Sequence, residues 1–224
     1  MKRKKAQLPA PAYLCSTVLG QQIIYNRRSL HEIYEGPIVE KTDITTSPTV
    51  QAALHTVQKN LDAALIDAVQ NNCIPQTIAR HIAHGANINA VCDGLSPLLL
   101  ASINRDVETV AFLLTHGANP MINGPYNNTP LHHIATDLTA KTLKIADLLI
   151  ISGASVNAQN DLGQTPLHLH GSAGEWYKKF ARLLIKNGAR LDLIDIKGNE
   201  PLEKLPEKVK EELLRFALFN LFDR

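Results

Sequence analysis

The chain has 224 residues, a formal net charge of +2 and three scattered cysteines, Cys15, Cys73 and Cys92. This charge argues against a general nucleic-acid binder, and an odd number of scattered cysteines argues against a disulfide framework and for a reducing compartment. No stretch reaches the roughly 20 apolar residues of a membrane span, and Pro9 and Pro11 interrupt the segment after the basic start, which disfavours a cleaved signal peptide.

Residues 1–47 form an N-terminal extension that fits no repeat. The extension is too apolar for a simple disordered tail, and Ser47 followed by Pro48 predicts a helix over residues 48–60. Two interpretations are open for this part of the chain. It is either a cap that hides the core at one end of the following domain, or a separate binding element.

A short phrase recurs four times in the rest of the chain. The copies read Ser96-Pro97-Leu98, Thr129-Pro130-Leu131-His132, Thr165-Pro166-Leu167-His168 and Glu200-Pro201-Leu202. Their prolines are separated by 33, 36 and 35 residues, and Gly-Ala pairs that begin at residues 85, 117, 153 and 188 keep nearly the same period. Two markers with one period indicate stacked structural repeats.

Each copy predicts a turn followed by two helices. Thr is a good helix N-cap, Pro suits the first helical position, and Gly ends a helix in the left-handed conformation. We expect one domain over residues 48–222. It comprises a capping helix at 48–60, repeats at about 61–90, 91–123, 124–159 and 160–194, and a C-terminal cap at 195–222. The expected helices of the repeats and cap span 61–71, 75–84, 97–104, 106–116, 130–136, 139–152, 166–172, 175–187 and 207–222.

The phrase Thr165-Pro166-Leu167-His168, followed by Leu183-Leu184-Ile185-Lys186-Asn187-Gly188-Ala189, resembles the ankyrin repeat over roughly residues 60–216. The resemblance implies an all-α solenoid of helix-turn-helix units with short hairpin loops. It also implies that the turn tips and the first helices form a concave, protein-binding face. In the family the His of the phrase is structural, which accounts for His132 and His168, whereas His170 stands where the pattern has Ala.

Catalytic and metal-binding chemistry finds little support in the sequence. His132, His133, His168 and His170 have no Cys or carboxylate at ligand spacing, and no Gly-rich phosphate loop is present. We therefore expect no catalytic residue, no metal site and no cofactor. A cysteine-dependent enzyme that uses Cys15 is a lesser alternative, since no family signature surrounds this residue.

The predicted contact residues for a protein partner lie at the turns and at an insertion in the fourth repeat. Leu95, Tyr126 and Leu162 are apolar at positions expected to be exposed, which indicates a contact patch, although single apolar surface residues are ordinary. Trp176 either packs on the core or projects as an anchor. The full set is Asp93, Leu95, Tyr126, Asn128, Asp161, Leu162, Gln164, Trp176, Tyr177, Lys197 and Asn199.

The C-terminal segment supports a second functional hypothesis. Leu205-Pro206 and the following amphipathic segment are loosely similar to the F-box-like and SOCS-box-like ends of some ankyrin proteins, which recruit ubiquitin-ligase adaptors. The alternative is that residues 205–222 only cap the stack. We thus predict a monomeric, intracellular, cytoplasmic adaptor that binds a protein and neither nucleic acid nor a membrane. A secreted bacterial effector in the host cytoplasm and a nuclear location are further readings.

Overall fold

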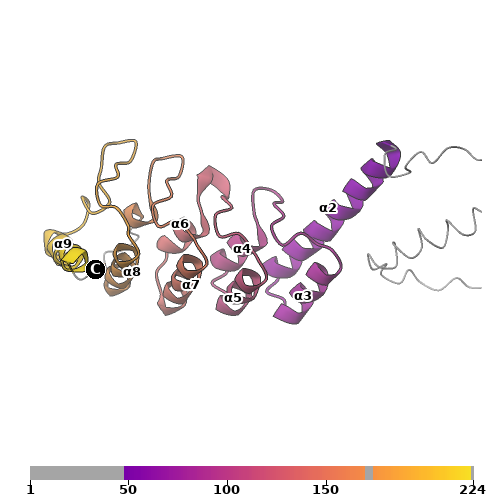
Figure 1. Cartoon of the computed structure of the whole chain (residues 1–224), viewed down its shortest axis with the longest axis horizontal. Helices are drawn as coiled ribbons and strands as arrows, with labels where there is room; N and C mark the ends of the chain where they lie inside the picture. The colour runs from indigo at the N-terminus through magenta and orange to yellow at the C-terminus, as the bar shows by residue number, and fades with distance from the viewer. Residues whose placement is uncertain (1–47, 170–173, 223–224) are drawn as a thin grey trace, which may run out of the picture.

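The computed structural model describes residues 48–169 and 174–222, so the predictions for residues 1–47, including Cys15, and for His170 lie outside the described residues. Within that part of the chain there are eight α-helices and no β-sheet, only an isolated bridge between Cys92 and Leu95. Figure 1 shows the helices stacked side by side in successive pairs, with loops rising from one edge. The all-helical repeat architecture expected from the sequence is confirmed.

Helix α2, Pro48–Gln70, is a single continuous helix where the sequence predicts two segments that meet near residue 60. Its sequence contains no Gly and no Pro after the first position, so nothing interrupts the backbone hydrogen bonds. Only Leu65, Ile66, Ala68 and Val69 of this helix are buried. The N-terminal half of α2 therefore projects beyond the stack, as Figure 1 shows. The division of the chain into an N-terminal extension and a repeat domain stays a prediction.

The next helices follow the expected pairs, and two of them, α4 and α5, have side-chain caps at their starts. They are α3 (Pro75–Ala83), α4 (Pro97–Ile103) and α5 (Val107–Thr115). Ser96 Oγ accepts a hydrogen bond from the Leu99 N–H at 3.2 Å, and Asp106 Oδ1 accepts from the Glu108 and Thr109 N–H groups. These bonds satisfy donors that have no partner inside a helix, so they fix where α4 and α5 begin.

The third and fourth units contain α6 (Pro130–Ala135), α7 (Ala140–Ile151) and α8 (Glu175–Lys186), and the chain ends in α9 (Glu207–Phe222). Of the helix predicted at 166–172, residues 170–172 lie outside the described residues, and the described part forms a 3-10 turn, η3 (Pro166–His168), rather than an α-helix. The Leu167 carbonyl accepts a hydrogen bond from the Tyr177 hydroxyl at 3.0 Å. Since an α-helix would give this carbonyl to the N–H of residue 171, the Tyr177 hydroxyl competes with helix continuation.

The helices form two rows around one core. The first row contains α2, α4, α6 and η3, and the second contains α3, α5, α7 and α8, with α9 packed on α8. No helix in the described ranges is both long and apolar enough to cross a membrane. The largest fully buried side chains are Leu65, Ile78, Leu98, Leu99, Leu113, Leu131, Ile134, Ile145, Leu149, Leu167, Tyr177 and Phe180. All of them except Leu99 belong to one hydrophobic core cluster.

Candidate functional site

The hairpin turns between units rise from the edge of the stack opposite the second helices (Figure 1). In the first of these turns Asp93 and Gly94 both have positive φ, 53° and 76°, and Leu95 and Cys92 exchange two backbone hydrogen bonds. Asp-Gly is a preferred pair for such a two-residue hairpin. Asp93 is exposed, but Leu95 is only half-exposed and packs against the core. The expectation that Leu95 lies free on the surface is therefore wrong.

The second turn holds the most unusual residue of the surface, Tyr126. Its φ is 58° and that of Asn127 is 60°, and the turn closes through the Asn128 N–H and the Pro125 carbonyl at 3.2 Å. The left-handed region suits Gly and Asn, whereas an aromatic residue there carries a strain of about 1–3 kcal/mol. The Tyr126 side chain is nevertheless 76% exposed, so burial in the described chain does not offset this strain.

The last two turns have the same hydrogen-bond pattern. In each, the side-chain oxygen of one residue accepts hydrogen bonds from the backbone N–H groups two and four residues later. Asn160 Oδ1 accepts from the Leu162 and Gln164 N–H groups, each at 3.0 Å. In the next turn Asp195 Oδ1 accepts from the Lys197 and Asn199 N–H groups, each at 2.9 Å. The side-chain amide of Asn199 also donates to both Asp195 oxygens, and these bonds lower the pKa of the Asp195 carboxyl to about 2.

The lowered pKa of Asp195 predicts an acid-sensitive turn. A carboxyl whose folded pKa lies below its unfolded value of about 3.9 stabilises the fold above that value and loses this stabilisation as the pH falls toward 2. Asp195→Asn keeps an acceptor oxygen, as Asn160 does in the preceding turn, but removes the titration. We expect the stability difference between wild type and Asp195→Asn, from urea unfolding at pH 7 to 2, to shrink between pH 4 and 2. An unchanged difference over that interval would contradict the assignment.

The histidines of the repeated phrase, His132 and His168, belong to the scaffold, as expected. His132 Nδ1 accepts from the Thr129 N–H at 3.2 Å, and His132 Nε2 donates to the Gln164 carbonyl at 2.8 Å. Burial lowers the pKa of His132, which favours the neutral ring that this pattern needs. His168 repeats the arrangement, with Nε2 3.2 Å from the Asn199 carbonyl. Both rings therefore tie one unit to the next turn.

The other predicted contact residues divide into exposed and linking positions. Asp161, Leu162 and Lys197 are exposed at the turn tips. Asn128, Gln164 and Asn199 are half-buried and have structural roles: Asn128 Oδ1 accepts from the Asn160 side chain, and the carbonyls of the other two bind the scaffold histidines. The turn tips that face solvent are thus Asp93, Tyr126, Asp161, Leu162 and Lys197.

Trp176 and Tyr177 start α8, in the row of second helices, so they do not share a surface with the turn tips (Figure 1). Trp176 is 41% exposed, with Lys179 Nζ 4.7 Å from its ring centroid. Tyr177 is fully buried, and burial raises its pKa, so its hydroxyl stays a neutral donor to Leu167. The prediction that Tyr177 contacts a partner is therefore wrong, because it is a core residue.

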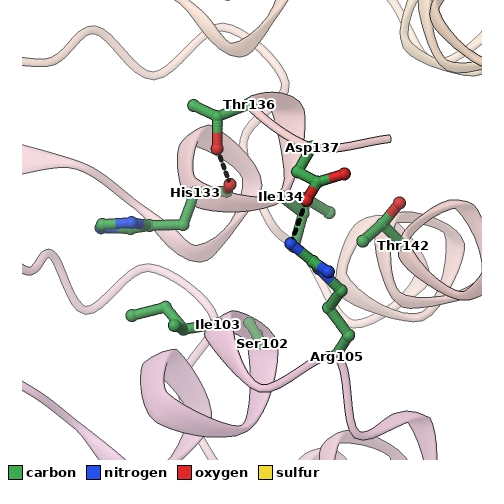
Figure 2. Close-up of a pocket in the computed structure, with 8 residues that line it drawn as sticks. All are labelled: Ser102, Ile103, Arg105, His133, Ile134, Thr136, Asp137 and Thr142. Atoms are coloured by element: carbon green, nitrogen blue, oxygen red, sulfur yellow. Dashed lines mark hydrogen bonds and ion pairs between the residues drawn. The ribbon is translucent and has the colours of Figure 1, made fainter. Parts of the chain in front are cut away.

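A small pocket lies where the second unit meets the third (Figure 2). Its volume is about 130 Å³, well below the 300 Å³ or more of typical ligand sites, and the Arg105–Asp137 ion pair crosses it. Ser102 Oγ, a lining hydroxyl, donates to the Leu98 carbonyl at 2.8 Å, and Thr136 Oγ1 donates to the His133 carbonyl at 2.7 Å. Both of these hydroxyls are thus engaged with backbone carbonyls, so this arrangement supports packing.

Two first-helix residues join the turn tips, and the predicted contact set missed both. Figure 2 shows Ile103 and His133 extending to the same side, away from the Arg105–Asp137 pair. Ile103 is 42% exposed, whereas His133 is half-buried and its Nε2, itself a buried atom, has no hydrogen-bond partner among the described residues. Burial lowers the pKa of His133, so its ring is neutral near pH 7 and retains an unused polar atom. In the sequence, Ile103 lies six residues after Pro97 and His133 lies three residues after Pro130, and these positions in the first helices could have identified both residues.

Comparison with known proteins agrees with this architecture. A family model described as "Ankyrin repeats (3 copies)" matches residues 65–160. The chain is 30% identical over 133 residues to "Putative ankyrin repeat protein FPV230" of fowlpox virus, covering 58% of this chain and 68% of that one. It is 38% identical over 124 residues to "Probable 26S proteasome regulatory subunit p28" of Saccharomyces cerevisiae, covering 54% and 52%. It is 31% identical over 204 residues to human "Rabankyrin-5", covering 82% and 17%. The chain therefore belongs to the ankyrin-repeat family.

Proposed function

We propose that this chain is an adaptor that binds another protein through its turn-tip surface. This surface comprises the exposed turn residues Asp93, Tyr126, Asp161, Leu162 and Lys197, with Ile103 and His133 of the first helices. Ankyrin repeats are protein-interaction modules, and stacked repeats provide an extended concave surface for a folded partner or an extended peptide. The chemical diversity of these positions suits recognition of one particular partner.

The observation that carries the proposal is Tyr126. This residue has the strained left-handed conformation described above and is three-quarters exposed. Backbone strain that folding does not repay is typical of binding positions, and Tyr is enriched among residues that dominate binding energy. Leu162 lies in the next turn and is 49% exposed, and the Asp161 N–H donates to the Tyr126 carbonyl at 3.1 Å, which holds the two tips together.

An affinity-capture experiment tests this surface. Tyr126→Ala/Leu162→Ala is compared with wild type and with Ile151→Ala as a matched control, because Ile151 is 75% exposed but ends α7 in the second row. We expect wild type and the Ile151 variant to retain the same proteins and the double variant to lose them. Retention of identical proteins by all three would exclude the turn-tip surface.

The ubiquitin-ligase alternative concerns α9, and the packing of this segment supports a capping role. Leu205 and Leu213 are buried, and α9 contacts α8. Glu212 forms ion pairs with Lys178, at 2.9 Å, and with Arg182, and the adjacent cations lower the pKa of Glu212. These contacts close the apolar face of α8. The effector role and the host-cell location stay predictions.

Deletion of residues 205–224 separates the capping role from the ligase role. We expect the truncated protein to lose about 3–6 kcal/mol of unfolding free energy, because Leu205 and Leu213 each bury a full side chain. Thermal unfolding followed by circular dichroism measures this loss. A truncated protein that melts like wild type but no longer binds a ligase adaptor would instead favour the F-box-like interpretation.

A further inference from the structure

Backbone hydrogen bonds join the last three hairpin turns into a short ladder. The Asp161 N–H donates to the Tyr126 carbonyl at 3.1 Å, and the Ile196 N–H donates to the Leu162 carbonyl at 3.0 Å. The pattern is periodic. Each donor residue lies five positions before the repeat proline of its own unit, and each acceptor residue lies four positions before the repeat proline of the preceding unit. The corresponding donor in the second turn is Pro125, which has no N–H, so the ladder begins at Tyr126.

The other end of the ladder is open. By the same period the next acceptor is the carbonyl of Lys197, and no backbone donor in the described ranges reaches it. A Cβ placed on Gly163 would lie 3.2 Å from Ile196 N and 3.3 Å from Asp195 Cα, so the following turn covers this glycine. The equivalent Gly198 has no such neighbour within 4 Å. In the preceding turn, the surface around Gly163 is covered by the backbone of Asp195 and Ile196. The equivalent surface around Gly198 in the last turn is therefore free to receive a polypeptide backbone.

The side chains at this open end are apolar where polar ones are expected. Ile194 and Ile196 are 56% and 66% exposed, and the equivalent residues of the preceding turn are Gln159 and Asp161. A terminal repeat ordinarily has a polar outer face because that keeps a solenoid soluble. Two exposed isoleucines in the turn that carries the unused Lys197 carbonyl therefore indicate a surface that a partner covers.

We propose that the open end of the turn ladder binds an extended segment of another protein. A backbone N–H of the segment donates to the Lys197 carbonyl, and its apolar side chains cover Ile194 and Ile196. This binding mode is similar to strand addition, in which the main chain supplies hydrogen bonds and alternate side chains supply selectivity. The site lies at the end of the ladder and shares Lys197, but neither Tyr126 nor Leu162, with the turn-tip surface.

A second copy of this chain does not fit the open end equally well. End-to-end stacking would need a donor from the first turns of the second copy. The donor position of its first turn is Cys92, whose N–H already donates to the Leu95 carbonyl at 3.1 Å. The donor position of the next turn is Pro125, which has none. Neither turn can therefore continue the ladder through end-to-end stacking of two copies.

A displayed library of random 12-residue peptides tests the proposal on the full chain. Ile194→Gln/Ile196→Asp installs the residues of the preceding turn, and Ile151→Asp is the control at an exposed position on α7. We expect selected peptides to bind wild type and the control equally and the double variant at least tenfold more weakly. N-methylation of one peptide amide should weaken binding to wild type about five- to tenfold, because it removes a backbone donor.

Three results would overturn the proposal. The first is a selection in which no peptide distinguishes wild type from the double variant. The second is full affinity of a selected peptide for wild type when its amides are methylated one at a time. This measurement uses only the wild-type protein, so it remains valid even if the double variant unfolds. The third is a wild-type dimer that the double variant converts to a monomer, which would make a second copy the occupant. Loss of binding in Tyr126→Ala/Leu162→Ala alone would instead report on the turn-tip surface.

Discussion

Replacing Tyr177 with Ala is expected to lower the unfolding free energy by about 3–5 kcal/mol, the range observed when a buried aromatic side chain is removed. Tyr177 is fully buried beside the other core residues of α8, and its hydroxyl donates to the Leu167 carbonyl at 3.0 Å. The substitution therefore leaves a cavity and also removes the donor from a backbone carbonyl in η3. Chemical denaturation monitored by circular dichroism measures the loss.

Two companion substitutions separate the causes of that loss. Tyr177→Phe keeps the ring and removes only the hydroxyl, and we expect a cost of about 1–2 kcal/mol. Trp176→Ala changes the neighbouring residue, which is 41% exposed, and we expect less than about 1 kcal/mol. A larger effect at Trp176 than at Tyr177 would reverse the assignment of the two residues to surface and core.

Replacing Tyr126 with Asn is expected to weaken partner binding at least 30-fold while stabilising the free protein by about 1 kcal/mol. Asn tolerates the left-handed conformation that Tyr126 adopts at φ 58°, so the substitution relieves strain. The loss of binding corresponds to the 2 kcal/mol or more that an aromatic anchor contributes. Calorimetric titration with the captured partner and thermal unfolding of the free protein measure the two effects.

Asp93→Asn is the matched control for Tyr126→Asn. Asp93 occupies a left-handed position in the preceding hairpin turn, at φ 53°, and is also exposed. Asp and Asn both tolerate this conformation, so we expect little change in stability. Higher stability of the free Tyr126→Asn protein with unchanged affinity for the partner would show that Tyr126 is strained but is not an anchor. Weaker folding would show that the strain argument is wrong.

The starts and ends of most helices follow from local signals in the sequence. Ser96 and Asp106 cap the helices that follow them, and the expected ranges for α4, α5, α7 and α8 are correct to within one residue at each end. Local chemistry decides these boundaries, since capping needs only residues within one helical turn. Local signals do not predict the 3-10 turn at 166–168, where the Leu167 carbonyl accepts from the Tyr177 hydroxyl, ten residues away in the sequence.

For the candidate site too, some residue roles follow from the sequence and others only from the tertiary structure. The Thr-Pro-Leu-His phrase by itself determined the family, the period and the structural role of His132 and His168. Only the tertiary structure decided that Leu95 and Tyr177 pack on the core, that Tyr126 is strained and exposed, and that the Lys197 carbonyl ends a ladder. The physical reason is range: capping and turn preferences act between near neighbours, whereas burial and inter-turn bonding depend on residues about 30 positions apart that stacking brings together.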